Sequence, residues 1–396
     1  MALKIIAAPA LGDVAQGVAG LFGGGLQAQG FSPDSKLLLV RGVYSDSAYP
    51  LLASRTAFWV YDIKLDQYSA CVNKLITSDR PIEVSDVAIA TFNGQIQLIA
   101  SYRDTGATAL NLNKLALIRN GVLVNGDLVS LVSGNLADAM VDAIRVSANG
   151  RFVAIETAAS NLTAELDTNG LKDIFLFDLV LNTSRRITTI NGAESGFDSL
   201  LGDILVGTDG SLSVAFESAQ VFTTQDSNGS NDVFVWRLLE SEFAVAGAGT
   251  ISLGSRSVSG AAGGNSPQLN SKGLVFNSES GAFSNADLNN VNDVWQSTGS
   301  AIELVSVGGS GTLAGPSSLA SSSDSGRVVA VVTASPEIAG ETGVEQLAIV
   351  NTVTRSTVIV SLFPLSSVLT SSQKAVHKIA RARRSRPADG SMTCGT

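Results

Sequence analysis

The sequence predicts an all-β fold, a single β-propeller with six blades of four antiparallel strands each, from three observations. The chain repeats itself about every sixty residues, it contains many short apolar runs, and turn-forming residues separate those runs. Of its 396 residues, 45% are hydrophobic, 15% are charged and 39 are glycine. This composition supports a large core and short strands, and it excludes a disordered chain.

The repeat is clearest in the middle of the chain. Three segments share the order turn, apolar run, polar loop and second apolar run; they are residues 147–179, 207–238 and 270–297. The polar loops begin at Asp167, Asp226 and Asp287, which are 59 and 61 residues apart. A repeat of this length has room for four short strands, as a propeller blade requires.

Fainter copies of the same unit flank the central three. Their first apolar runs are residues 37–40, 96–100 and 328–332, and each follows a turn sequence. Continuous apolar runs of this length are typical of strands buried on both faces. We therefore count six units between about residue 30 and residue 362.

This count divides the chain into three regions. Residues 1–29 form an N-terminal extension, either a strand that closes the propeller or a degenerate export signal, although Asp13 and Gln16 interrupt its apolar stretch. Residues 30–363 form the propeller, and residues 364–396 form a basic, flexible tail. The sequence has no apolar run of 18 residues, so we expect no transmembrane segment.

Charge is unevenly distributed. The formal net charge is −9, yet residues 374–386 hold six basic residues and no acidic one. These basic residues are Lys374, Lys378, Arg381, Arg383, Arg384 and Arg386. The tail is open to several interpretations. It is a solvated, disordered end or the stub of a longer precursor, or it binds an acidic partner, anionic lipid or nucleic acid. The acidic partner includes the acidic body of a neighbouring copy. The acidic body itself is a poor binder of nucleic acid.

Two sequence motifs carry a resemblance to a known family. The turn Ser-Pro-Asp-Ser-Lys at 32–36 leads into an apolar run, and Asp-Ile-Phe-Leu-Phe-Asp at 173–178 ends a central unit. Both resemble the WD-like repeat of bacterial TolB-type β-propellers, and residues 147–297 match a variant with a D-x-N-G-x-x-D loop. The resemblance covers about residues 30–362 and implies a non-enzymatic binding module of the bacterial envelope or exterior.

The polar loops are the strongest candidates for chemistry. Each follows the pattern D-x-N-x-x-x-D. The first loop contributes Asp167, Asn169 and Asp173; the second, Asp226, Asn228 and Asp232; and the third, Asp287, Asn289 and Asp293. Oxygen ligands at alternate positions of a tight loop are what Ca²⁺ requires. Asp and Asn also close Asx turns without a metal. Both interpretations are open, and the turn is favoured.

Catalytic motifs are sparse. The single histidine, His377, lies in the basic tail, so a Ser-His-Asp or Cys-His mechanism in the propeller is not expected. Glycoside hydrolysis needs only paired carboxylates, but no arginine cluster for an acidic sugar is apparent in the body. Trp59, Trp236 and Trp295 fall in second apolar runs, at what we take as equivalent positions, and are interpreted as core residues.

Together these features predict a non-enzymatic propeller that acts as a protein-binding or structural assembly module. We expect it to be extracellular, cell-surface or periplasmic, with a protein partner or its own copies, and without a cofactor other than structural Ca²⁺. Two alternatives remain: a carbohydrate-active propeller enzyme, either sialidase-like or another glycosidase, and a component of a large viral or cell-surface assembly held by its termini. A carboxylate pair in a central pocket would favour the enzyme.

Overall fold

The structure is a computed structural model that describes most of residues 27–359. The ranges within that span that it does not describe are 34, 45–54, 66, 77–81, 105–112, 126–136, 164–166, 258–259, 285–286, 288, 290, 300, 309–310, 313–314 and 336–344. The chain forms two compact units. One contains residues up to 166 and residues 177–184, and the other contains residues 167–176 and continues from residue 185.

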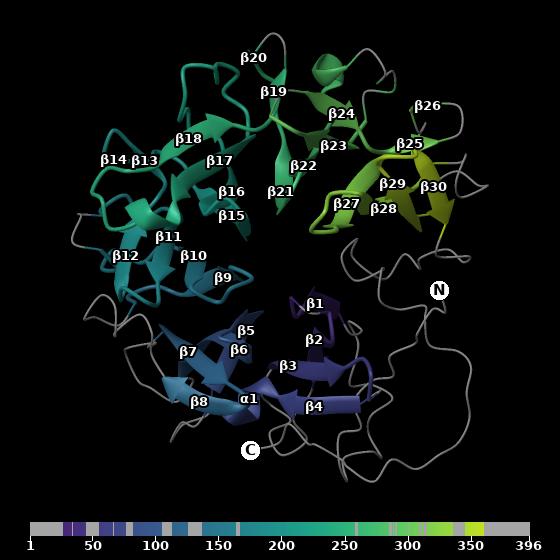
Figure 1. The fold of residues 1–396 in the computed structure, drawn as a ribbon. Helices are drawn as coiled ribbons and strands as arrows, with labels where there is room; N and C mark the ends of the chain where they lie inside the picture. The colour runs from purple at the N-terminus through teal and green to yellow at the C-terminus, as the bar shows by residue number, and fades with distance from the viewer. Residues whose placement is uncertain are drawn as a thin grey trace. The chain divides into compact units, whose positions relative to one another are not determined.

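Six four-stranded antiparallel sheets form the blades of a six-bladed β-propeller, which confirms the predicted fold class (Figure 1). The first sheet contains β1 (Gln27–Phe31), β2 (Leu37–Tyr44), β3 (Arg55–Asp62) and β4 (Gln67–Cys71). The second contains β5 (Ile82–Phe92), β6 (Gln95–Asp104), β7 (Asn113–Arg119) and β8 (Val122–Asn125). A helical turn, α1 (Val72–Leu75), lies between them in the sequence.

The other four sheets follow the same plan. The third contains β9 (Val141–Val146), β10 (Phe152–Thr157), β11 (Asp173–Asp178) and β12 (Thr183–Arg186). The fourth contains β15 (Ser199–Val206), β16 (Ser211–Ser218), β17 (Asp232–Leu239) and β18 (Thr250–Leu253). The fifth contains β21 (Asn265–Asn270), β22 (Gly273–Ser278), β23 (Asp293–Ser297) and β24 (Ile302–Leu304). The sixth contains β27 (Ser317–Ser322), β28 (Val328–Thr333), β29 (Gln346–Asn351) and β30 (Ser356–Ile359).

Every sheet is therefore built from four strands that are consecutive in the sequence. The first described strand begins at Gln27, three residues before the predicted start of the propeller, and the last ends at Ile359. Residues 3–8, which we considered as a closing strand, and the basic tail lie outside the described residues. No helix in the described part of the chain is both long enough and apolar enough to cross a membrane.

Burial explains why the apolar runs form the middle strands. All six residues of β10 and all six of β11 are buried, as expected for strands covered on both faces. Asn93 and Gly94 make the turn between β5 and β6 with positive φ angles of 49° and 74°, the conformation that a two-residue hairpin requires. The predicted Asn-Gly turn is thus present.

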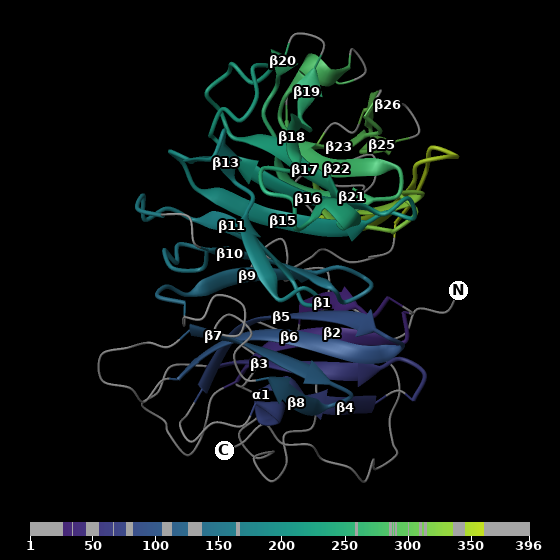
Figure 2. The same ribbon diagram turned by 60° about the vertical axis from the view of Figure 1, so that its left-hand side comes forward.

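Neighbouring sheets pack through continuous apolar clusters. In the first unit, Leu39, Phe58 and Val60 of the first sheet share a core with Ile89 and Leu98 of the second. Figure 2 shows the strands of these two sheets side by side. In the second unit, one cluster joins the fourth and fifth sheets and another joins the fifth and sixth. Burial of these faces against each other is the main stabilisation of the fold.

The first strand of every sheet contains an irregularity that the sequence analysis did not anticipate. Its pairing with the second strand shifts register once, which is the mark of a β-bulge. The residues left without a pairing partner are Gln29, Ser85, Asp142, Gly202, Ser266 with Pro267, and Ala320. A bulge re-aims the side chains around it, so the repeated position is structurally distinctive.

A short hairpin follows each of the third, fourth and fifth sheets. These hairpins are β13 (Thr189–Ile190) with β14 (Ala193–Glu194), β19 (Arg256–Ser257) with β20 (Gly260–Ala261), and β25 (Val307–Gly308) with β26 (Gly311–Thr312). They occur after the three blades that carry the D-x-N loops. Thr168 N donates to Glu194 Oε1 at 2.6 Å and Ala261 N donates to Gln225 O at 3.2 Å, so two of the hairpins contact their loops.

Candidate functional site

The second aspartate of each D-x-N loop is a buried anchor. Asp173, Asp232 and Asp293 begin β11, β17 and β23, and each side chain has no exposed surface. A hydroxyl group that follows the fourth strand donates to Oδ1 of each; the donors are Thr188, Ser255 at 2.5 Å and Ser306 at 2.5 Å. The repeat therefore fixes one carboxylate oxygen in the same way three times.

The asparagine of each loop closes an Asx turn. Leu171 N donates to Asn169 Oδ1 at 2.8 Å, and Ser230 N donates to Asn228 Oδ1 at 2.7 Å. The same bond joins Val291 N to Asn289 Oδ1 at 3.1 Å. Gly170 and Gly229 follow two of these asparagines with φ angles of 66° and 65°, which glycine adopts without strain. The asparagines thus act as turn residues.

The first aspartate of each loop is also buried, and in the third blade it faces an arginine. Asp167 is 6% exposed, and its Oδ2 lies 3.3 Å from Arg186 Nη1. The same Nη1 atom lies 3.5 Å from Asp173 Oδ2 and 3.7 Å from Glu194 Oε1. One guanidinium group therefore neutralises several carboxylates at a single buried point.

The fourth and fifth blades repeat the aspartate pair, but among the described residues no basic side chain forms an ion pair with it. Asp226 and Asp287 are 4% and 7% exposed. Both side-chain oxygens of Asp226 lack a hydrogen-bond partner in the described residues, as do Oδ2 of Asp232, Asp287 and Asp293. A buried carboxylate without a partner is strongly disfavoured, so each of these two pairs carries an unfavourable excess of negative charge.

The protonation of these pairs reflects their burial. Burial, with a smaller contribution from the charge of Asp287, raises the pKa of Asp293 to about 6, although the hydroxyl of Ser306 opposes the shift. Burial, with the charge of Asp232, also raises the pKa of Asp226. In the third blade, burial raises the pKa of Asp173 to about 6 although Thr188 and Arg186 oppose the shift.

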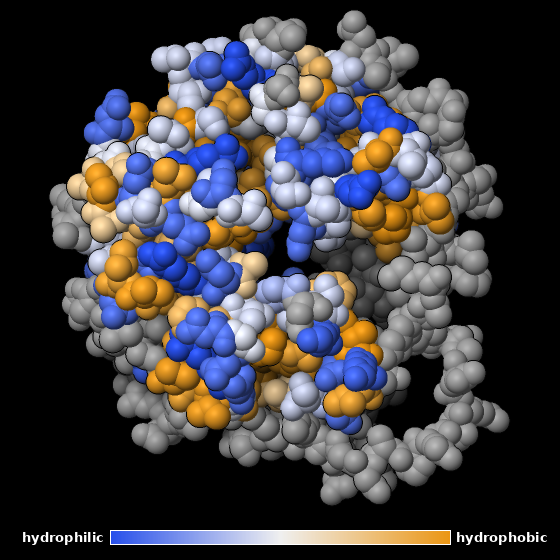
Figure 3. All heavy atoms as spheres, in the orientation of Figure 1, coloured by the Kyte–Doolittle hydropathy of each residue, from blue (hydrophilic) through white to orange (hydrophobic). Residues whose placement is uncertain are grey.

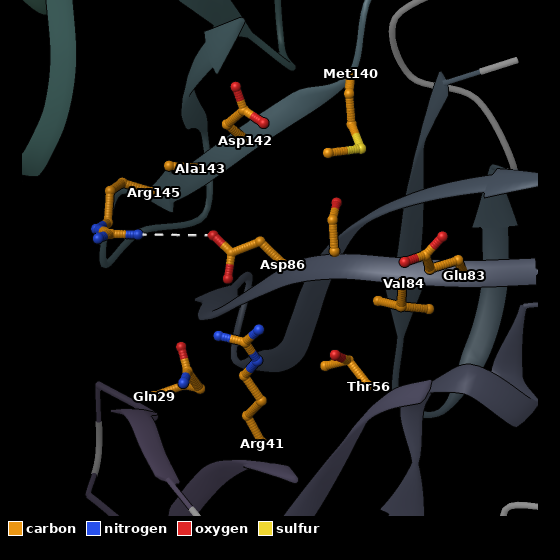
Figure 4. A pocket seen from close by; sticks show the side chains of 11 residues that line it. Gln29, Arg41, Thr56, Glu83, Val84, Asp86, Met140, Asp142, Ala143 and Arg145 are labelled. Carbon is orange, nitrogen blue, oxygen red and sulfur yellow. Dashed lines mark ion pairs between the residues drawn. The ribbon is translucent and has the colours of Figure 1, made fainter. Parts of the chain in front are cut away.

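A second candidate site is a polar pocket within the first unit. Its volume is about 410 Å³, and residues of β1, β2, β3, β5 and β9 line it together with Met140 (Figure 4). The three bulge residues of this unit, Gln29, Ser85 and Asp142, all belong to the lining. The bulges therefore direct the backbone and side chains that form this pocket.

Arginines and carboxylates meet in this pocket. The guanidinium groups of Arg41 and Arg145 both point toward Asp86, and Arg145 Nη1 lies 3.8 Å from Asp86 Oδ2 (Figure 4). Strands that are distant in the sequence thus bring Arg41 of β2 and Arg145 of β9 into the lining of one pocket. Glu83, also in the lining, is engaged by Arg103, whose Nε lies 2.7 Å from Glu83 Oε2.

Asp86 joins two blades. Its Oδ1 accepts a hydrogen bond from Val87 N at 2.9 Å, and its Oδ2 accepts one from Ile144 N of β9 at 2.9 Å. Asp203 makes the equivalent pair of bonds to Ile204 N and Leu269 N in the second unit. Burial raises the pKa of Asp86, and Arg145, the two backbone amides and Arg41 oppose the shift.

Asp86→Asn should change the pH dependence of stability. The raised pKa means that the folded state binds the Asp86 proton more tightly than the unfolded chain, so this stabilisation is complete at low pH and is lost as the pH rises through the folded pKa. The difference between the unfolding free energies of wild type and variant should be larger at pH 4 than at pH 7. Urea denaturation across this range measures it. A difference that increases with pH would contradict the assignment.

The tail residues Lys374, Lys378, Arg381, Arg383, Arg384 and Arg386, and His377, lie outside the described residues. Within the residues that the structure does describe, no three His, Cys, Asp or Glu side chains gather as a metal site. Arg186 and Glu194 were not predicted from the sequence. Arg186 ends β12 and Glu194 lies on the hairpin that follows this blade. The sequence signal for Arg186 is its position two residues before Thr188, the hydroxyl donor.

Comparison with known proteins supports the fold. No protein-family model and no curated protein sequence matches the chain. The β-propeller domain of the Trilobed protease from Pyrococcus furiosus, described as having an open velcro topology, matches with a TM-score of 0.50 at 9% identity, covering 85% of this chain and 83% of that one. This match shows the propeller fold alone.

Two other solved structures are similar at a lower level. TolB from Acinetobacter baumannii matches with a TM-score of 0.40 at 16% identity, covering 87% of this chain, and the chain spans only 66% of the length of that structure. Oligogalacturonate lyase from Vibrio parahaemolyticus matches with a TM-score of 0.47 at 11% identity, covering 85% of this chain and 77% of that one.

Proposed function

We propose that this chain is a non-enzymatic propeller, exported or surface-associated, that binds a protein partner or another copy of itself through the pocket of the first unit. The observation that supports this function is the pair of guanidinium groups of Arg41 and Arg145 in a pocket lined by bulge residues. Guanidinium groups bind carboxylates through paired, charge-assisted hydrogen bonds. The favoured ligand is therefore an acidic segment of a protein.

The surroundings of the pocket fit a peptide ligand. Met140, at its edge, is 40% exposed and offers a flexible apolar contact beside the arginines. Over the described part of the face in Figure 3, hydrophilic and hydrophobic residues are interspersed. A small polar pocket with one apolar wall is thus a better candidate for recognition than a broad apolar area on this face.

Site-specific photo-crosslinking tests this function. A photoreactive residue in place of Met140 is expected to capture one protein or a second copy in the cells that produce this chain. The matched position Val245, 54% exposed and outside the pocket lining, should give no such adduct. The double variant Arg41→Glu and Arg145→Glu should abolish the adduct at position 140. An adduct that persists in the double variant would refute the pocket as the binding site.

A carbohydrate-active enzyme is the second candidate, and one observation favours it. Glu83, Asp86 and Asp142 all line the pocket, and paired carboxylates are the requirement of glycosidase chemistry. Against it, both oxygens of Asp86 accept backbone hydrogen bonds and Glu83 is paired with Arg103. Turnover of oligosaccharides that is abolished in Asp86→Asn and Asp142→Asn would replace the binding proposal with this one.

A further inference from the structure

The third, fourth and fifth blades can be superimposed residue by residue through their hydrogen bonds. Ile187 N donates to Ile174 O, and the same bond joins Gly254 N to Val233 O and Val305 N to Val294 O. The hydroxyl donors Thr188, Ser255 and Ser306 follow directly in the sequence. The residues one position earlier than the shared N–H donors are Arg186, Leu253 and Leu304, each the last residue of its fourth strand.

One position therefore differs in charge between the blades. Arg186 supplies the cation that lies between Asp167 and Asp173 in the third blade. Leu253 and Leu304, both buried, supply no charge to the fourth and fifth blades. The aspartate pairs are nevertheless retained and equally buried in those blades. Each retains a net charge of about −2 without a compensating cation when both groups are ionised.

The oxygens left without partners are the ones that face the missing cation. In the third blade, Arg186 contacts Oδ2 of both aspartates. In the fifth blade, the atoms that have no hydrogen-bond partner among the described residues are Oδ2 of Asp287 and Oδ2 of Asp293. In the fourth blade they are Oδ2 of Asp232 and both oxygens of Asp226. The unsatisfied acceptors thus correspond to the atoms that bind the guanidinium group in the third blade.

From this correspondence we infer that the Asp226–Asp232 and Asp287–Asp293 pairs each bind one hard divalent cation, Ca²⁺, at the position that the Arg186 guanidinium group occupies in the third blade. Two carboxylates balance the charge of one such ion, and oxygen-only ligands match its preference. Water would complete the coordination of each ion. The third loop, by contrast, carries its own cation and binds no metal.

The two sites are expected to bind weakly. Two carboxylates per loop give a low ligand charge, as in extracellular modules with dissociation constants on the order of 10⁻⁴–10⁻³ M. Their effect is structural, because a ligand that binds only the folded chain raises its stability. This inference does not depend on the pocket of the first unit or on any partner bound there.

Calorimetric titration of the full chain with CaCl₂, after treatment with EGTA and its removal, counts the sites. Wild type should bind two Ca²⁺ per chain and show a melting temperature several degrees higher in CaCl₂ than in EGTA. Asp232→Asn and Asp293→Asn should each bind one ion, and the double variant none. Asp324→Asn, which removes an exposed carboxylate elsewhere, is the matched control and should bind two.

A gain-of-site variant tests the same correspondence in the opposite direction. Arg186→Leu places leucine at the position that Leu253 and Leu304 hold in the other two blades. The variant chain should bind a third Ca²⁺, and CaCl₂ should restore the stability that the substitution removes. The asparagine variants decide the question even if this variant fails to fold. The inference is overturned if wild type binds no Ca²⁺ at millimolar concentration, or if the double asparagine variant binds as many ions as wild type.

Discussion

Replacing Arg186 with methionine is expected to lower the free energy of unfolding by about 3–5 kcal/mol in the presence of EGTA. The guanidinium side chain is 1% exposed and lies between Asp167 and Asp173. Methionine preserves most of the side-chain volume, so the loss is electrostatic: two carboxylates remain buried without their cation. Chemical denaturation at pH 7.5 measures the change.

Arg355→Met is the control for this experiment. Arg355 Nη1 lies 3.7 Å from Glu303 Oε2, but both side chains are about half exposed. Water screens such a pair, so its loss should change stability by no more than about 1 kcal/mol. Equal effects of the two substitutions would show that Arg186 is not the buried counterion of the third loop.

Trp295→Ala is expected to reduce stability by about 3–5 kcal/mol. Trp295 has no exposed surface, its ring centroid lies 5.0 Å from that of Phe283, and it shares a core cluster with Phe276. Truncation removes this contact area and leaves a cavity between the fourth and fifth sheets, which the surrounding strands cannot fill completely. Thermal and chemical denaturation both report the loss.

Phe197→Ala provides the comparison for this core substitution. Phe197 is also aromatic but is 52% exposed, and its removal should alter stability by less than about 0.5 kcal/mol. A similarly small effect of Trp295→Ala would contradict the assignment of Trp295 to the core.

The repeat predicted the blades because hydrophobic spacing and turn residues are local signals. The interpretation of Trp59, Trp236 and Trp295 as buried is confirmed. The predicted equivalence of Trp236 and Trp295 is wrong by two residues. Trp295 pairs with Phe276 in the fifth blade, and the corresponding pair in the fourth blade is Phe234 with Phe216. Trp236 lies two residues after Phe234. A shift of two residues keeps a side chain on the same face of a strand, so burial could be predicted without the register.

The sites depend on features that sequence spacing does not carry. Arg41, Asp86 and Arg145 come from β2, β5 and β9 of three different sheets, and they meet only because these strands line one pocket. The bulges that shape this pocket have no fixed residue type, since Gln29, Ser85 and Asp142 occupy the same position. The D-x-N motif singled out the aspartates in the sequence. Their burial, and the fact that leucine in the fourth and fifth blades occupies the position of Arg186, depend on the three-dimensional structure.

A crystal structure of the full chain grown with CaCl₂ and measured for anomalous scattering tests the central claim most directly. We expect one anomalous peak between Asp226 and Asp232 and another between Asp287 and Asp293. Between Asp167 and Asp173 we expect the guanidinium group of Arg186 and no anomalous peak. A map without peaks at the two later pairs, or one that shows the carboxylates of each pair in direct contact through a shared proton, would contradict it.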